Sequence, residues 1–264
     1  MLNVPLKDFQ RSQAFNEVAE IYDSARPGYP VKLIEDIIEL TNLPTSAKIL
    51  DIGTGTGKGT VPFAEKGYTI HCLDPGEKLI AIASQNLRSF PLVTFETATF
   101  EDWNCTSSAF NLVISAQAFH WVNREIGYPK AASVLKPGGH IALFWNFFTP
   151  SDTPVSRALN QAYQECVPSS DESQPSISSL IDKRQNWIND SKCFKNLIIQ
   201  QYPWLVEYNA EQYLNLIKTQ TIYQKFTELE KQNLTDAVVR ILSEYGGYIT
   251  KSYLTVLFFA QKDG

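Results

Sequence analysis

The sequence has few histidines and cysteines, and their spacing is not that of metal ligands. The four cysteines are Cys72, Cys105, Cys166 and Cys193; they form no C-x-x-C pair, and the three histidines are scattered. A structural zinc site needs closely spaced thiolates and imidazoles. We therefore expect no metal ligands, and each cysteine is expected to be a small buried or incidental thiol.

Clustered positive charge and long apolar runs are also missing. The net charge is −5 and no dense Lys/Arg tract occurs, so a nucleic-acid partner is not expected. The longest apolar runs, around residues 141–148 and 253–260, are too short to span a bilayer. The N-terminus lacks the basic region and apolar run of a signal peptide. These features predict a cytoplasmic protein without a membrane partner, and they leave its oligomeric state open.

The chain of 264 residues is 44% hydrophobic and 19% charged, which fits a globular protein with a substantial core. Alternating apolar runs and amphipathic stretches between residues 31 and 148 favour a doubly wound parallel sheet. We predict strands at residues 48–52, 69–73, 91–97, 110–115 and 140–148, and helices at 31–40, 60–66, 77–87 and 128–135.

Residues 149–191 differ in composition and include a polar Ser/Pro tract at 167–179. That tract is typical of a mobile connection inside an insertion, with helical pieces at 156–165 and 180–188. The insertion is either a lid over a substrate or a tolerated surface excursion. Beyond it we expect a strand at 197–208, helices at 210–218 and 228–244, and a last strand at 253–260.

Four glycines follow the first predicted strand, at Gly53, Gly55, Gly57 and Gly59. So many positions without a Cβ suit a tight turn that a ligand can approach closely. A P-loop is excluded because Ile52 and Gly59 occupy positions where that motif needs glycine and Ser/Thr. The dinucleotide motif G-x-G-x-x-G fails because Lys58 stands at its third glycine.

The remaining pattern, Asp51-x-Gly53-x-Gly55-x-Gly57, resembles motif I of the class I S-adenosylmethionine (SAM) dependent methyltransferases. The turn Leu135-Lys-Pro-Gly-Gly139 is similar to another turn that those enzymes share. The resemblance implies SAM as the cofactor, with the glycine turn around its methionyl part. A glycine turn without a ligand is the alternative.

The segment Tyr22-Asp-x-x-Arg26-Pro-x-Tyr-Pro30 resembles the N-terminal signature of the type 11 methyltransferases, including their trans-aconitate methyltransferase-like branch. In that family the segment folds over the cofactor, and the resemblance implies that Arg26 faces the methionine carboxylate. A guanidinium suits this role because its fork matches a carboxylate. A surface arginine beside a turn is the alternative.

Asp74 directly follows the second predicted strand. An acid there, about 20 residues beyond the glycine turn, can accept hydrogen bonds from both ribose hydroxyls. It can also cap the next helix, which Pro75 and Gly76 begin. Thr99 stands where the family has an acid for the adenine amino group, and Phe100 follows it; the substitution leaves the backbone contact to the ring but not the side-chain contact.

The fourth predicted strand leads into Ala116-Gln-Ala-Phe-His-Trp121, which is similar to the same branch of the family. Its place after a parallel strand predicts that Gln117 and its neighbours lie near the reacting methyl group. His120 can act there as a general base or can be a packed histidine that orients the loop. Trp145, Phe147 and Phe148 either line the substrate cavity or belong to the core.

We therefore predict an α/β, Rossmann-like, doubly wound fold with a seven-stranded, mostly parallel sheet and an inserted helical lid segment. Residues 1–264 are expected to form a single methyltransferase domain: 1–30 cover the cofactor, 31–148 bind SAM, 149–196 form the insertion and 197–264 complete the sheet with an antiparallel edge strand. The predicted cofactor residues are Tyr22, Arg26, Asp51, Gly53, Thr54, Gly55, Gly57, Asp74, Pro75, Thr99, Phe100 and Gln117, and His120 is the candidate catalytic residue.

The predicted reaction is in-line methyl transfer to a small-molecule acceptor, for which the resemblance suggests a carboxylic acid. Such a transfer depends more on alignment and exclusion of water than on a base. A SAM-binding sensor or accessory protein without an acceptor stays open, and a NAD-dependent oxidoreductase is disfavoured by Lys58.

Overall fold

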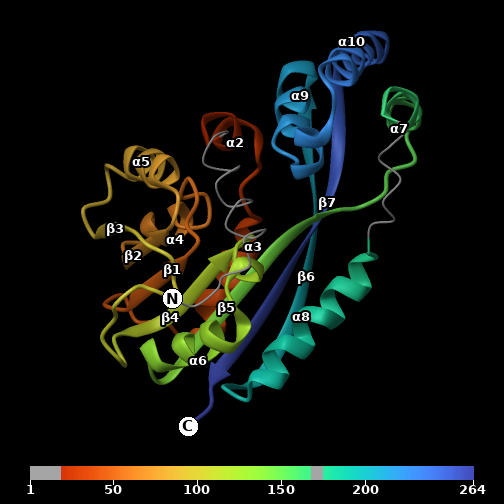
Figure 1. The fold of residues 1–264 in the computed structure, drawn as a ribbon. Coiled ribbons are helices and arrows are strands. Elements are labelled where there is room, and N and C mark those ends of the chain that lie inside the picture. Colours follow the sequence, from red (N-terminus) through yellow and green to blue (C-terminus); the bar gives the residue numbers. More distant parts are fainter. Residues whose placement is uncertain (1–18, 168–174) are drawn as a thin grey trace.

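The structure, a computed structural model, describes residues 19–167 and 175–264 (Figure 1). The first 18 residues of the expected cofactor-covering segment and residues 168–174 of the Ser/Pro tract lie outside the described residues.

One sheet of seven strands, in the order β3-β2-β1-β4-β5-β7-β6, organises the fold (Figure 1). Strands β1 to β5 are mutually parallel, β7 is antiparallel to β5, and β6 is antiparallel to β7. The predicted fold class is thus confirmed. The strands are β1 (Lys48–Ile52), β2 (Thr69–Asp74), β3 (Val93–Thr97), β4 (Phe110–Ala116), β5 (Leu135–Phe148), β6 (Phe194–Asn209) and β7 (Tyr248–Lys262).

The antiparallel strand is not at the edge, as the sequence suggested, because β6 continues the sheet beyond it. This position explains why β7 contains the long apolar run. Residues 255–260 are all buried, as expected for a strand covered on both faces.

Helices cover both faces of the sheet. On one face, α3 and α4 contribute Leu33, Ile37 and Phe63 to a core cluster with Ile49 of β1. On the other face, α6 and α8 pack against the opposite side of β4 and β5. The helices are α2 (Ala19–Ala25), α3 (Val31–Thr41), α4 (Val61–Ala64), α5 (Glu77–Asn86), α6 (Arg124–Val134), α7 (Pro154–Cys166), α8 (Ile177–Ser191), α9 (Ala210–Lys218) and α10 (Glu228–Glu244), with short 3₁₀ turns η1 (Phe119–Trp121) and η3 (Thr221–Lys225).

A third cluster lies where β6 and β7 extend past the parallel strands. Helices α2, α7, α9 and α10 gather around this end (Figure 1) and bury Ala25, Leu159, Leu216 and Val238 together with Tyr253 of β7. Helix α2 thereby packs near elements that lie almost 200 residues later in the chain.

Some elements begin earlier than expected. Helix α6 starts at Arg124 because the side chain of Asn123 accepts a hydrogen bond from the Glu125 N–H and caps it. Strand β5 starts at Leu135, with a register shift where it pairs with β4, so the predicted exit turn is part of the strand. Among the helices of the described residues, none has the length and apolar character needed to cross a membrane.

Candidate cofactor and acceptor site

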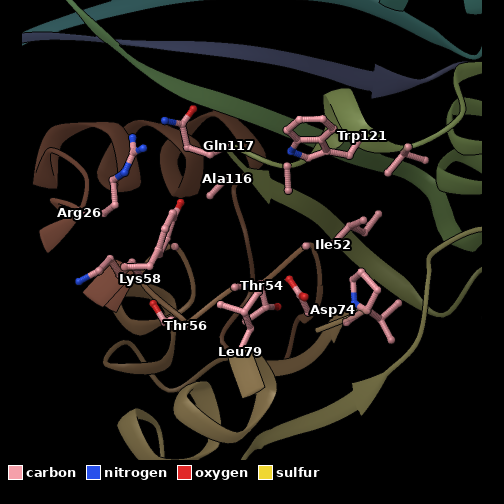
Figure 2. A pocket seen from close by; sticks show the side chains of 18 of the residues that line it. Arg26, Ile52, Thr54, Thr56, Lys58, Asp74, Leu79, Ala116, Gln117 and Trp121 are labelled. Carbon is pink, nitrogen blue, oxygen red and sulfur yellow. Dashed lines mark hydrogen bonds between the residues drawn. The ribbon is translucent and has the colours of Figure 1, made fainter. Parts of the chain in front are cut away.

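A cavity opens at the carboxyl ends of the parallel strands, where ligands bind in sheets of this kind. Figure 2 shows Arg26, Asp74 and Gln117 around one hollow, although they come from the residue after α2, from β2 and from the turn after β4. The predicted cofactor residues that line it are Tyr22, Arg26, Gly53, Thr54, Gly55, Asp74, Pro75, Thr99, Phe100 and Gln117. Asp51, Gly57 and His120 lie outside its wall.

The glycine turn forms one wall of the cavity. Gly53 has φ +70°, and a Cβ there would come within 2.2 Å of the Ala118 Cβ, so only glycine fits. The N–H groups of Gly53 and Thr54 both donate to the carbonyl of Leu73, at 2.8 and 3.0 Å, which ties the turn to β2. Gly55 has φ +58°, and a Cβ on it would meet no atom within 4 Å. The main chain at Gly55 is therefore open to the cavity.

Gly57 is needed for packing instead. A Cβ there would approach Leu87 Cδ1 to 2.9 Å, at the end of α5, and the φ of +90° again favours glycine. The sequence motif thus combines glycines that face the cavity with one that lets a helix close on the turn.

The carboxylate of Asp74 connects the two loops that flank the cavity. Its Oδ2 accepts from the Gly55 N–H at 2.9 Å, and its Oδ1 accepts from the Gly76 N–H at 2.8 Å. Gly76 is itself the N-cap residue of α5, so Asp74 is not the cap that the sequence allowed. Burial raises the pKa of Asp74, and the two N–H donors oppose that rise. Each oxygen keeps a second lone pair with which to accept from a hydroxyl group.

Asp51 supports the turn from below. Only 1% exposed, it accepts a 2.6 Å hydrogen bond from the Thr60 hydroxyl at Oδ2, while Oδ1 is buried without a partner among the described residues. Burial raises its pKa to about 7. Its direct contact with a cofactor was predicted from the motif; the structure instead places it beneath the turn, because the strand alternation turns its side chain inward.

Arg26 reaches the cavity from the end of α2. Its Nε donates to the Thr219 hydroxyl at 2.8 Å and its Nη2 donates to the Thr219 carbonyl at 3.1 Å. These bonds fix the guanidinium, which lies 5.5 Å from the centroid of the Tyr22 ring. Nη1 has no hydrogen-bond partner among the described residues, so one donor edge is available to an anionic ligand.

The opposite end of the cavity is lined by Leu79, Thr99 and Phe100. The Thr99 hydroxyl donates to the Asp102 carboxylate at 2.8 Å and accepts from the Asp102 N–H, so it is used within its own turn. The Phe100 ring is buried in the core. The Thr99 side chain is thus engaged within its own turn, and a backbone contact to an adenine ring at these positions stays a prediction.

Gln117 stands at the turn after β4 with φ +61°, a conformation uncommon for residues other than glycine and concentrated at functional sites. Its backbone N–H donates to the Phe144 carbonyl at 2.9 Å, and its side-chain Nε2 donates to the Asn146 carbonyl at 3.2 Å. The side-chain amide is thereby held beside the cavity, and its oxygen has no hydrogen-bond partner among the described residues.

His120 faces the core side of the sheet. Its Nδ1 accepts from the Trp145 indole N–H at 3.1 Å, and its ring lies 4.5 Å from that of Trp121. Burial, and then the charge of Arg184, lower its pKa to about 4. The base role is therefore not supported, and the alternative of a packed histidine that orients the loop is favoured.

The aromatic residues of β5 divide between the two faces. Phe148 lines the cavity, whereas Trp145 is buried in the core and Phe147 packs against it. Residues 149–196 contribute no described residue to the cavity wall. Helix α8 covers the sheet, and α7 packs in the cluster around the far ends of β6 and β7. The interpretation of the insertion as a lid stays a prediction.

Several lining residues were not predicted: Thr56, Lys58, Asn146 and Tyr253. The Thr56 hydroxyl is buried with no partner among the described residues, and its place inside the glycine turn was a signal that could have identified it. Lys58 lies 3.7 Å from Asp23 of α2 and joins that helix to the turn. Asn146 donates to the Gly28 carbonyl at 3.0 Å, a contact across 118 residues that no local pattern reveals.

Comparison with known proteins agrees with this geometry. Residues 49–139 match the profile of a family described as a methyltransferase domain. An uncharacterized methyltransferase of Mycobacterium tuberculosis, Rv3342, is 32% identical over 136 residues, which are 51% of this chain and 53% of that protein. The Saccharomyces cerevisiae protein CRG1, named as a probable SAM-dependent methyltransferase, is 31% identical over 147 residues, covering 54% of this chain and 50% of its own. The aligned part spans about half the length of these curated relatives.

Solved structures share the fold. One from Anaeromyxobacter dehalogenans has a TM-score of 0.67 at 20% identity, covering 89% of this chain and 97% of its own. A Haemonchus contortus phosphoethanolamine N-methyltransferase solved with S-adenosylhomocysteine has a TM-score of 0.57 at 15% identity, covering 100% of this chain and 61% of its own. The [4+2]-cyclase SpnF has the same TM-score at 16% identity, covering 97% and 96%. Because a cyclase also has it, the fold by itself does not fix the reaction.

The methyltransferase-domain match and the curated relatives support the class I SAM-dependent methyltransferase expectation. They do not distinguish the trans-aconitate-like branch, which stays a prediction.

Proposed function

We propose that this protein, whose residues 49–139 match a methyltransferase domain, transfers a methyl group from SAM to a small organic acceptor. The observation that carries the proposal is the cavity wall on which Gly55, Asp74 and Arg26 stand together. An open main chain, a carboxylate and a guanidinium are the groups needed for an amino-acid tail and a ribose.

The residues present fit SAM. The open space at Gly55 and the hydroxyl of Thr56, which has no partner within the described part of the chain, suit the methionyl part. Asp74 suits the ribose hydroxyls, and Arg26 suits the carboxylate. When bound, SAM supplies an electrophilic methyl group on its sulfonium. The chain's own contribution is to position the two reactants, with Gln117 and Trp121 at the acceptor end, and to exclude water.

The acceptor is proposed to arrive as a nucleophile, with a carboxylate as the first candidate. Among the described residues that line the cavity there is no histidine, and the only acids are Asp74 and Glu101. Glu101 accepts from the Asn123 N–H at 2.8 Å, and Asp74 holds the two loops. A carboxylate acceptor needs no proton removed at neutral pH, so it suits a cavity without a base. Cytoplasmic location and the absence of nucleic-acid and membrane partners remain predictions.

Ligand binding tests the proposal first. Thermal unfolding should be shifted upward by SAM and by S-adenosylhomocysteine but not by NAD, because a ligand that binds only the folded state stabilises it. Stabilisation by NAD alone would overturn the assignment. Incubation with methyl-labelled SAM and a panel of small acids, phenols and amines then separates an enzyme from a SAM-binding sensor. Binding of SAM without labelled product from any class would favour the sensor.

A further inference from the structure

At its acceptor end the cavity is bounded by aromatic rings from two neighbouring strands, and a ring from a third strand packs against them. Phe148 of β5 and Tyr253 of β7 pair directly across the antiparallel ladder, and both line the cavity. Their ring centroids lie 4.9 Å apart, and Trp204 of β6 lies 5.3 Å from Tyr253 on the other side. This wall is formed where β6 and β7 extend past the parallel strands and meet α9.

The polar groups of this wall are hydroxyls. The Tyr253 hydroxyl is 2.7 Å from that of Tyr208, and both residues are buried. Either oxygen can donate in this pair, so one of the two protons stays available for a further acceptor.

A lysine stands beside these rings, and no described residue supplies a counter-ion to it. Lys251 lies two residues before Tyr253 and therefore on the same face of β7. Its Nζ is 5.6 Å from the Phe148 ring centroid and 5.7 Å from that of Tyr213 on α9. Burial lowers the pKa of Lys251. Within residues 19–167 and 175–264 it forms no ion pair, and Glu207 and Glu211, the acids at the facing ends of β6 and α9, are exposed to solvent.

An ammonium in such a place is incompletely compensated. Aromatic faces attract a cation, but they replace only part of its hydration. An anionic group would compensate the charge fully. The Phe148 ring that separates Lys251 from the cavity is 37% exposed, and the four-carbon lysine stem can extend past its edge. The cavity side of the Phe148–Tyr253 pair is therefore suited to an anion.

The position of Lys251 also says which part of an acceptor it can bind. Two residues along a strand span about 6.6 Å, so the ammonium is displaced from Tyr253 and farther still from Gln117 at the turn after β4. A group held by Lys251 is thus separate from an atom that receives a methyl group beside Gln117.

We propose that Lys251 binds an anionic group of the acceptor that is distinct from the methylated atom. The inference rests on the proposed function and narrows it: the acceptor is a small organic acid with two functional groups, one that is methylated and one carboxylate that anchors the molecule at the Phe148–Tyr253 wall.

The test measures binding to the protein saturated with S-adenosylhomocysteine. The probes are glutarate, adipate and isophthalate, matched with valerate, hexanoate and benzoate, which have a single carboxylate. Dissociation constants come from ligand-observed NMR for the unaltered protein, Lys251→Met, Lys251→Arg and the control Lys66→Met, whose lysine is exposed and does not line the cavity. Circular dichroism confirms that each variant is folded.

The two-carboxylate probes should bind the unaltered protein about tenfold more tightly than their matched partners, as expected for a charge-assisted contact. Lys251→Met should abolish this advantage, while Lys251→Arg and Lys66→Met should keep it. The inference is overturned if Lys251→Met retains the advantage or if the unaltered protein shows none. The affinity for S-adenosylhomocysteine is read separately and should be the same in all four proteins; its absence in the unaltered protein would refute the proposed function itself.

Discussion

The indole N–H of Trp145 donates a 3.1 Å hydrogen bond to Nδ1 of His120. The bond assigns the proton of the neutral imidazole to Nε2. Over the Trp145 ring, at 4.5 Å from its centroid, lies the Arg184 guanidinium of α8. A histidine in this arrangement is held neutral, and it orients the loop that carries Trp121 into the cavity.

This arrangement predicts how stability depends on pH. The pKa of His120 is lowered to about 4 in the folded state, against about 6.5 when unfolded. The unfolded chain therefore binds a proton first, and stability falls as the pH falls from 6.5 towards 4. Between pH 7.5 and 4.5 this effect should cost about 2–3 kcal/mol. Urea unfolding at both pH values measures the effect. Between them, His120→Gln should lose about 2–3 kcal/mol less free energy of unfolding than the unaltered protein does. Equal losses in the two proteins would contradict the assigned environment.

Asp51 should have the opposite dependence. Its pKa is raised to about 7, so the folded state takes up the proton first and stability falls as the pH rises from about 4 towards 7. Between pH 5.5 and 8 the loss attributable to Asp51 should be about 2 kcal/mol. Asp51→Asn keeps the shape of the side chain and should remove this loss. Because protonation of His120 has the opposite effect on stability, Asp51→Asn and His120→Gln are both compared with the unaltered protein over the same pH series. If the free energy of unfolding of Asp51→Asn followed pH in parallel with that of the unaltered protein, the prediction would be wrong.

Much of the parallel half of the sheet was predictable from sequence, because its information is local. The strand from Lys48 to Ile52 and the turn that follows were identified from apolar residues and glycines that are neighbours in the chain. The placement of Asp74 followed from the same rule of parallel sheets. The features that could not be predicted depend on the pairing of strands that are distant in the sequence.

The acceptor end shows this limit. Asn146 and Tyr253 meet there only because β5 and β7 pair in one particular antiparallel register, with Phe148 opposite Tyr253. For His120 the sequence left two roles open for a related reason: its motif indicated the loop but not the face of the sheet to which the imidazole turns. Asp51 likewise belongs to the motif and yet points below it.

The glycines of the turn should separate stability from binding. Gly53→Ala places a methyl group 2.2 Å from the Ala118 Cβ at a positive φ, and should lower the free energy of unfolding by about 2–4 kcal/mol. Gly55→Ala meets no atom and should cost only about 1 kcal/mol, from its φ of +58°. Its methyl group stands in the cavity, so the affinity for S-adenosylhomocysteine should fall about tenfold. Urea unfolding and calorimetric titration measure the two quantities; a Gly55→Ala protein that binds normally would place the ligand elsewhere.

Asp74→Ala should weaken S-adenosylhomocysteine binding by about 1–3 kcal/mol, because a buried acceptor of the ribose hydroxyls is lost. The same change frees the Gly55 and Gly76 N–H groups, so binding is compared with stability measured in parallel. Glu77→Ala is the matched control, since this neighbouring acid is exposed. Unchanged affinity in a folded Asp74→Ala protein would remove the ribose role.

Arg26 offers the sharpest test of which end of the cofactor lies where. Two of its guanidinium nitrogens hold Thr219, and the third is available to the ligand. Arg26→Lys keeps the charge but cannot bind Thr219 and a carboxylate together. Its affinity for S-adenosylhomocysteine should therefore fall about tenfold. Its affinity for 5′-methylthioadenosine, which has no amino-acid tail, should be unchanged.

Comparing the two ligands separates a direct contact between Arg26 and the amino-acid tail from a general effect of the substitution on the fold. Thr219→Val removes the hydroxyl that orients Arg26 without removing the guanidinium, so it should reduce S-adenosylhomocysteine affinity less than Arg26→Lys does. If Arg26→Lys weakened both ligands equally, the arginine would act by holding α2 against α9 rather than by meeting the carboxylate. Weaker binding of S-adenosylhomocysteine with unchanged binding of 5′-methylthioadenosine requires a contact between Arg26 and the amino-acid tail. A general loosening of α2 would weaken the binding of both ligands.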